Sequence, residues 1–220
     1  MPEPVLSEAD LARVEAAVGT AEKRTSGEIV PYIVRHSADY DAAVWRAASA
    51  GALVATAAVL ALAALYGGWS LAWTASPWAV AGASVGGGLA GALLGAFVPG
   101  VRRLVAGPAA LAAEVHRRAA QAFLDEEVFD TRDRTGILLF VSLFERRIEV
   151  IGDAGINAKV ETAEWVEVVD LVRAGIRQKD LAGGLVAAVG MCGDLLERRG
   201  VALRDDDTDE LSDRVRLRDA

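Results

Sequence analysis

The chain has 220 residues, a formal net charge of -8 and an isoelectric point near 4.9. This acidic balance argues against a nucleic-acid partner, since nucleic acids select basic surfaces. The single cysteine, Cys192, excludes an intrachain disulfide and fits a reducing compartment. A mean hydropathy of +0.29 beside 25% charged residues indicates an average of two unlike parts, one apolar and one charged.

The chain opens with a pattern typical of a helix followed by a strand. Ser7 is a good N-cap, and apolar residues at helical spacing follow it, so we expect a helix that ends near Arg24. Residues 28–35 (EIVPYIVR) are apolar on both faces, which predicts a strand covered on both sides. Pro31 donates no ladder hydrogen bond, so one side of this strand should be an edge at that point.

A long uncharged stretch follows. Residues 47–101 contain no Asp, Glu, Lys, Arg or His. Because about 20 apolar residues cross a bilayer, the stretch has room for two spans, predicted at about 47–66 and 78–98, with a turn between them. The alternative is a buried helical hairpin in a soluble protein, which would need a larger partner layer than the rest of the chain supplies.

The flanks of this stretch predict its orientation. A hairpin returns the chain to the side it left, and the two outer ends carry arginines whereas the turn carries no charge. The positive-inside rule then places both termini and the soluble parts in the cytoplasm. Tryptophan rings favour the headgroup level. The residues expected at the membrane interface are Arg46, Trp69, Trp73, Trp78, Arg102 and Arg103.

Small residues recur every four positions in the second predicted span. They are Ala83, Gly87, Gly91 and Gly95. Such a stripe lets two helices approach closely. It predicts either packing against the first span or a face for homo-oligomers.

The sequence after the uncharged stretch, residues 102–199, predicts more helices and strands. We expect helices over 108–127, over 162–178 and from Asp180 to about 199, and strands over 136–144 and 148–151. Strands joined through a helix should be parallel, and the last two strands form a hairpin. The pattern predicts an α/β fold, a small α/β/α sandwich around a mixed sheet, with the transmembrane helical hairpin inserted after the first strand. Residues 1–46 and 102–199 would form the domain, 47–101 the hairpin and 200–220 a disordered charged tail.

Several short motifs in this order resemble the TPM-domain family. They are Ser26-Gly27-Glu28-Ile29, Arg134-Thr135-Gly136-Ile137-Leu138, Val141-Ser142-Leu143, Glu145-Arg146-Arg147, the run from Ile148 to Ile156, Trp165 and Gly184-Leu185. The family is named for a thylakoid lumen protein, a photosystem II repair protein and a nematode receptor modulator. The resemblance covers roughly residues 6–46 and 108–199 and is closest to the bacterial membrane-anchored branch, which implies a place in the inner (plasma) membrane of a bacterium.

The resemblance implies an α/β/α sandwich and a role in membrane-complex assembly or repair. Plant members have been described as acid phosphatases and calcium binders. Many members carry a glycine-tyrosine-glycine-leucine-glutamate loop after the last strand, whereas this chain has Gly152-Asp153-Ala154-Gly155-Ile156. The usual aromatic residue and acid are therefore absent, and Asp153 is the carboxylate that remains for calcium.

Strand directions predict one candidate site. The start of the first strand, the segment before the second and the loop after the third should converge at one end of the sheet. The candidate residues are Ser26, Glu28, Arg132, Arg134, Thr135 and Asp153. Carboxylates with hydroxyls suit a hard cation such as Ca²⁺, and arginines suit a phosphate or carboxylate. The same residues also fit a network that caps loops, or a site where a peptide or protein docks.

Two function hypotheses follow. In the first, the chain is a non-enzymatic, membrane-anchored interaction module that docks on another membrane protein during its assembly, repair or quality control. In the second, by family analogy, it is a metal-dependent acid-phosphatase-like enzyme that binds calcium. No complete catalytic constellation is evident in the sequence, which favours the first.

Overall fold

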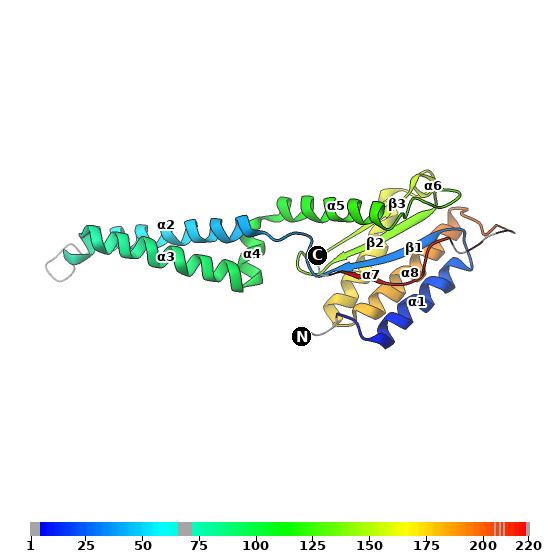
Figure 1. Ribbon diagram of the computed structural model, residues 1–220, viewed down its shortest axis with the longest axis horizontal. Helices are drawn as coiled ribbons and strands as arrows, with labels where there is room; N and C mark the ends of the chain where they lie inside the picture. Colours follow the sequence, from blue (N-terminus) through cyan, green and yellow to red (C-terminus); the bar gives the residue numbers. More distant parts are fainter. Residues whose placement is uncertain (1–4, 66–71, 205, 207, 209, 219–220) are drawn as a thin grey trace. The chain divides into compact units, whose positions relative to one another are not determined.

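The computed structural model describes residues 5–65, 72–204, 206, 208 and 210–218. The chain divides into two compact units. One comprises residues 1–37 and 114–220, and the other comprises residues 38–113. Figure 1 shows the elements of both.

In its described residues, the first unit holds four strands and most of the helices. Its elements are α1 (Glu8–Glu22), β1 (Glu28–Val34), β2 (Gly136–Ser142), β3 (Arg147–Gly152), α6 (Ala154–Asn157), η2 (Thr162–Glu164), α7 (Trp165–Gln178), α8 (Leu181–Arg198) and β4 (Arg216–Arg218). Helix α5 (Pro108–Asp125) contains the boundary between the two units.

The sheet is mixed and has the strand order β3-β2-β1-β4. Strands β1 and β2 are parallel, in register from Glu28 opposite Gly136 to Val34 opposite Ser142. Strand β3 returns antiparallel to β2, and β4 lies parallel to β1. The predicted mixed sheet, with its parallel pair and its hairpin, is confirmed.

Two helical layers cover the sheet. On one face, α1, α7 and α8 pack on side chains such as Ile33 and Leu139, and on the other face α5 packs on side chains such as Tyr32 and Phe140. Every residue of β1 and β2 is buried, as the uninterrupted apolar runs predict. The predicted α/β/α sandwich is therefore confirmed, and Figure 1 shows the layers.

Local sequence signals set the helix ends. The Ser7 hydroxyl accepts a hydrogen bond from the Asp10 amide at 3.1 Å, and the Asp10 carboxylate accepts one from the Ser7 amide at 3.3 Å. This capping box starts α1 where the sequence predicts it. Asp180 caps α8 in a similar way, accepting from the Gly183 amide at 2.8 Å.

The expectation of a disordered tail over residues 200–220 is wrong where the tail forms β4. Strand β4 pairs with Tyr32–Val34. The charged residues of the tail are not all solvated, because Arg216 and Arg218 pair with Glu126 at 3.1 and 3.2 Å. The ladder with β4 does not include Pro31, so the predicted local edge at the proline is confirmed.

The second unit is built from α2 (Asp41–Leu65), η1 (Ala72–Ala75), α3 (Pro77–Phe97) and α4 (Pro99–Ala106). Helices α2 and α3 are long and apolar enough to cross a membrane, by length and composition. Their outer side chains, such as Leu53, Val85 and Phe97, are largely exposed. Tyr66, the predicted end of the first span, lies outside the described residues.

The backbones of helices α2 and α3 approach each other closely. A Cβ atom added at Gly87 would clash with the carbonyl oxygen of Gly51, and one at Gly91 with that of Ala47. The hydroxyls of Thr56 and Ser84 hydrogen-bond between the helices at 2.7 Å. Of the two uses that the sequence allows for the stripe, the structure shows the contact with α2.

This close contact predicts a position-specific effect of alanine. Gly91→Ala should lower the thermal unfolding temperature of the full chain in detergent micelles, because overpacking costs about 1–3 kcal/mol. Gly86→Ala is the matched control, since a Cβ at Gly86 meets nothing within 4 Å and alanine is favoured in a helix by about 1 kcal/mol. Circular dichroism melts compare the two variants. Equal melting temperatures would contradict the contact.

Candidate functional site

The six candidate residues lie at one end of the sheet. Glu28 begins β1 and Ser26 lies two residues before it, and Asp153 directly follows β3. Arg132, Arg134 and Thr135 precede β2. Hydrogen bonds connect these segments, as the strand directions predict.

Arg134 and Asp153 form the central ion pair of this end. The Arg134 guanidinium donates to both carboxylate oxygens of Asp153, with Nη2 at 2.9 Å from Oδ1. The Asp153 side chain is 6% exposed, whereas that of Arg134 is 54% exposed. The hydrogen bond from Arg134 to Asp153 raises the pKa of the Arg134 guanidinium. Asp153 also caps the short helix α6, accepting from the Ala154 amide at 2.7 Å.

Two glycines allow the loops around this ion pair to approach each other. The Gly155 amide donates to the Arg134 carbonyl at 2.9 Å, and a Cβ at Gly155 would clash with the carbonyl oxygen of Asp133. The Asp153 amide donates to the Gly136 carbonyl at 2.9 Å, and a Cβ at Gly136 would clash with the carbonyl oxygen of Val128. Both glycines belong to the motifs that carry the family resemblance. Their role in this chain is close packing of the backbone.

Thr135 joins the starts of the two parallel strands. Its hydroxyl donates to the Ser26 carbonyl at 2.6 Å, and its carbonyl accepts from the Glu28 amide at 3.2 Å. Thr135 is buried, so these bonds are shielded from water. Thr135 therefore links the segments that begin β1 and β2, and its hydroxyl is not presented to a ligand.

Glu28 and Arg132 contact the C-terminal part of the chain, which the sequence analysis missed. The buried Glu28 carboxylate accepts from the amides of Glu210 and Leu211, both at 3.3 Å. Arg132 pairs with Asp206 at 2.8 Å, and its hydrogen bond lowers the pKa of the Asp206 carboxyl. In the sequence, the acidic residues of the tail are the signal that could have indicated a partner for Arg132.

The donor set at Asp153 does not fit calcium. Both carboxylate oxygens already accept from Arg134, and a guanidinium at hydrogen-bond distance repels a cation. Calcium needs six to eight oxygen ligands. Among the described residues, no cluster of three or more His, Cys, Asp and Glu could hold a metal ion.

A second polar cluster, also missed from the sequence, lies at the opposite end of β1 and β2. The Ser142 hydroxyl donates to the Glu145 carboxylate, and the Ser37 and Ser142 hydroxyls are 2.9 Å apart. The Ser37 amide donates to the other Glu145 oxygen at 2.9 Å. These bonds tie the β2–β3 turn to the end of β1. Because all three side chains are buried, the cluster is closed to substrates.

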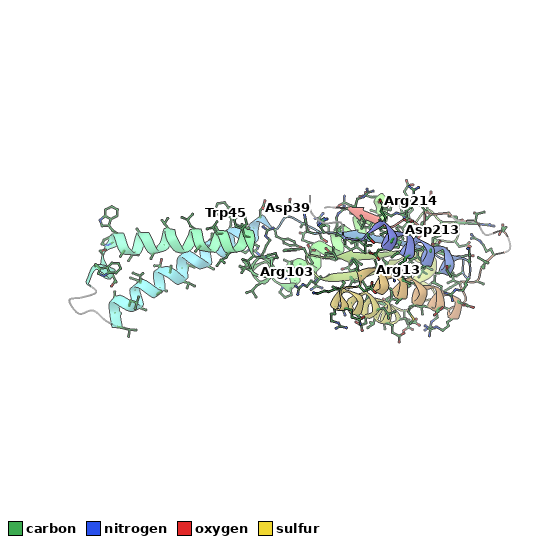
Figure 2. The ribbon with its side chains drawn as sticks, turned by 90° about the horizontal axis from the view of Figure 1, so that it is seen from below. Arg13, Asp39, Trp45, Arg103, Asp213 and Arg214 are labelled. Carbon is green, nitrogen blue, oxygen red and sulfur yellow. The ribbon has the colours of Figure 1, made fainter. Side chains whose placement is uncertain are left out.

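The predicted membrane-interface residues of the turn and of α2 are exposed. Trp73 and Trp78 are 65% and 86% exposed and flank the start of α3, and Arg46 is exposed on α2. Trp69 lies outside the described residues. A further exposed ring, Trp45, was missed and lies near the start of α2 (Figure 2).

The predicted interface arginines after α3 lie on α4. Arg102 folds back and donates to the carbonyls of Gly95 and Ala96 at 3.1 and 2.8 Å, which caps the end of α3. Arg103 follows it on the same short helix (Figure 2). Both arginines therefore lie at the end of the hairpin that also holds Trp45.

The close approach at Gly155 predicts that a single methyl group destabilises this end of the sheet. Gly155→Ala should lower the free energy of unfolding by about 1–3 kcal/mol, because backbone must move to admit the Cβ. Gly190→Ala is the matched control, since a Cβ there meets nothing within 4 Å. Chemical denaturation of the full chain in micelles measures both. An unchanged stability for Gly155→Ala would contradict the geometry.

The occupied carboxylate predicts the outcome of a calcium titration. We expect no saturable heat when CaCl₂ is titrated to millimolar concentration into the full chain in micelles. Asp153→Asn should leave that result unchanged while it removes the charge that pairs with Arg134, a loss of about 1–2 kcal/mol of stability. Saturable binding that disappears in Asp153→Asn would restore the metal-site hypothesis.

Comparisons with known proteins find similarity to one domain family and to one solved fold. The TPM domain family matches residues 105–195, a range that includes β2, β3, α7 and most of α8. No curated protein matches the chain. The chain is also similar to the NMR structure of the BA42 protein from the psychrophilic bacterium Bizionia argentinensis, with a TM-score of 0.60, 17% identity and 99% of each chain covered. At that identity the likeness concerns the fold, and over residues 105–195 the chain is similar to a TPM domain.

Proposed function

We propose that this chain is a two-span membrane protein whose TPM-like unit is a non-enzymatic module that docks on another membrane protein. The observation that carries the proposal is the pair of helices α2 and α3, which keep large apolar side chains exposed along their length. A face of that kind is stable in lipid and unfavourable in water. The docking partner would be a protein undergoing assembly, repair or quality control.

The dimensions of the hairpin support a membrane anchor. At about 1.5 Å per residue, the stretch from Trp45 to Leu65 spans about 30 Å, the thickness of a hydrocarbon core. Exposed tryptophans lie at both ends of the hairpin, as in the aromatic belts of membrane proteins. The arginines at one end and the uncharged turn at the other favour both termini in the cytoplasm, at a bacterial inner membrane.

The state of the candidate site supports docking over catalysis. Asp153 is held by Arg134, Thr135 bonds to backbone, and Glu28 accepts backbone amides. General acid–base or nucleophilic catalysis needs a group that can reach a substrate. These polar groups stabilise loops instead, and the loops present a surface.

The experiment combines topology with crosslinking in native membranes. Single cysteines at Ser76 in the turn and at the exposed Ala187 on α8 are introduced in a Cys192→Ser background. An impermeant maleimide should label only Ser76→Cys in intact cells, and both variants after permeabilisation. Labelling of Ala187→Cys in intact cells would contradict the cytoplasmic orientation.

Photo-crosslinking residues at the exposed positions Leu124 and Val166 then test docking. We expect discrete adducts with an integral membrane protein, and no hydrolysis of p-nitrophenyl phosphate by the purified full chain with Ca²⁺ or Mg²⁺. Turnover that is lost in Asp153→Asn, with no adduct at either position, would favour the phosphatase-like alternative.

A further inference from the structure

The C-terminal part of the chain runs along the side of β1 that faces away from β2. We name the described residues 202–204, 206, 208 and 210–218 the C-terminal strap. The strap first crosses the end of the sheet at Ser26 and Glu28 and then adds β4 to β1. It therefore occupies the edge of β1 that β2 does not cover.

At the start of β1 the strap is recognised mainly through its backbone. The Ser26 hydroxyl donates to the Ala202 carbonyl at 2.9 Å and accepts from the Arg204 amide at 3.1 Å. Glu28 accepts the amides of Glu210 and Leu211. Contacts of this type bind the backbone of an extended chain and depend little on most of its side chains.

Charged side chains add selectivity at two points. Arg132 binds the carboxylate of Asp206 at 2.8 Å and donates its own amide to Glu210 at 3.1 Å. Further along, Glu126 accepts from Arg216 at 3.1 Å. The edge thus selects carboxylates near the start of β1 and a guanidinium near its end.

The strap is packed more loosely than the strand beneath it. Every residue of β1 is buried, whereas the strap residues Leu217 and Arg218 are exposed. The Arg132 and Asp206 side chains are 58% and 68% exposed, so solvent screens their ion pair. An open cavity of about 650 Å³ is lined by Glu15 and Ala16 of α1 and by residues 210–214 of the strap. Beside it Asp213 lies close to α1, because a Cβ at Gly19 would come within 2.6 Å of its carboxylate.

We propose that the edge of β1 is a strand-docking site which the C-terminal strap closes, and that a partner protein opens it by inserting an extended peptide of the same pattern. That pattern is two carboxylates about four residues apart, then an apolar residue, then an arginine between apolar residues. The inference rests on the proposed docking function and names its surface and the chemistry of its partner. An uncovered edge strand is a ready template for strand addition.

The test uses the full chain in micelles and a fluorescent synthetic peptide of residues 203–220 as the probe. The double variant Leu211→Asp/Arg216→Glu alters the strap and leaves the edge of β1 intact. Because the wild-type strap competes at high effective concentration, we expect the peptide to bind the double variant at least about tenfold more tightly than wild type. A peptide that carries the same two changes is the control and should not bind.

A charge swap tests the site near the end of β1. The peptide with Arg216→Glu and Arg218→Glu should bind the double variant poorly and recover when the protein also carries Glu126→Arg, because Glu126 pairs with both arginines. A general loss of structure would not produce this recovery. Absence of peptide binding to a folded double variant would overturn the proposal.

Hydrogen exchange of the wild-type chain gives an independent measurement if the double variant does not fold. Amides of Glu210–Arg218 should exchange at least about 100-fold faster than those of the β1–β2 ladder, because a detachable strap opens locally. Exchange of the strap together with the core would overturn the proposal. A wild-type dimer that the peptide dissociates would identify a second copy as the occupant and would also overturn it.

Failure of this inference is separable from failure of the proposed function. If the photo-crosslinked adducts persist in excess peptide while the peptide does not bind the double variant, docking stands and the β1 edge is not its site. If the peptide binds as expected but no membrane protein is crosslinked, the edge is a strand-docking site and the proposed docking role in the membrane is wrong.

Discussion

The parallel ladder between β1 and β2 is the contact on which the rest of the structure depends. At its start, Thr135 bonds to the Ser26 carbonyl across 109 positions of sequence, and the whole apolar hairpin lies within that interval. The entropic cost of closing so long a connection grows only slowly with its length, and a hairpin of two antiparallel helices returns the chain close to where it left. The fold can therefore hold a large insertion between neighbouring strands, provided that both ends of the ladder are firmly closed.

Both ends are closed by polar groups, and this explains the character of the candidate site. Thr135, Asp153 and the glycines beside them join the loops at one end. Ser37, Ser142 and Glu145 do the same at the other. Each buried polar group that bonds to backbone avoids the penalty of about 1–3 kcal/mol for an unpaired group. Residues that look chemically versatile in the sequence thus stabilise the two ends of the ladder.

Elements with strong periodicity could be predicted from the sequence, and elements that depend on distant partners could not. Helices α1, α7 and α8 and strands β1 and β2 follow from apolar spacing and caps, and the convergence at Asp153 follows from strand directions. Strand β4 was missed because its charge suggested solvation, whereas Glu126 and the β1 edge supply partners that only the fold brings near. The cluster at Glu145 was missed for the same reason, since Ser37 is separated from it by 108 positions.

Pro31 gives the fold a safeguard during synthesis. Strand β1 leaves the ribosome before either of its sheet neighbours, and the apolar segment around it has no partner while the hairpin is being made. An exposed segment of this composition is a template for intermolecular pairing. A proline in the middle interrupts any such ladder, because it offers no amide proton to a second chain. The native sheet tolerates the interruption, since β4 begins to pair only at Tyr32, one residue later. Pro31 therefore shortens the ladder between β1 and β4 and also disfavours β-pairing between nascent chains.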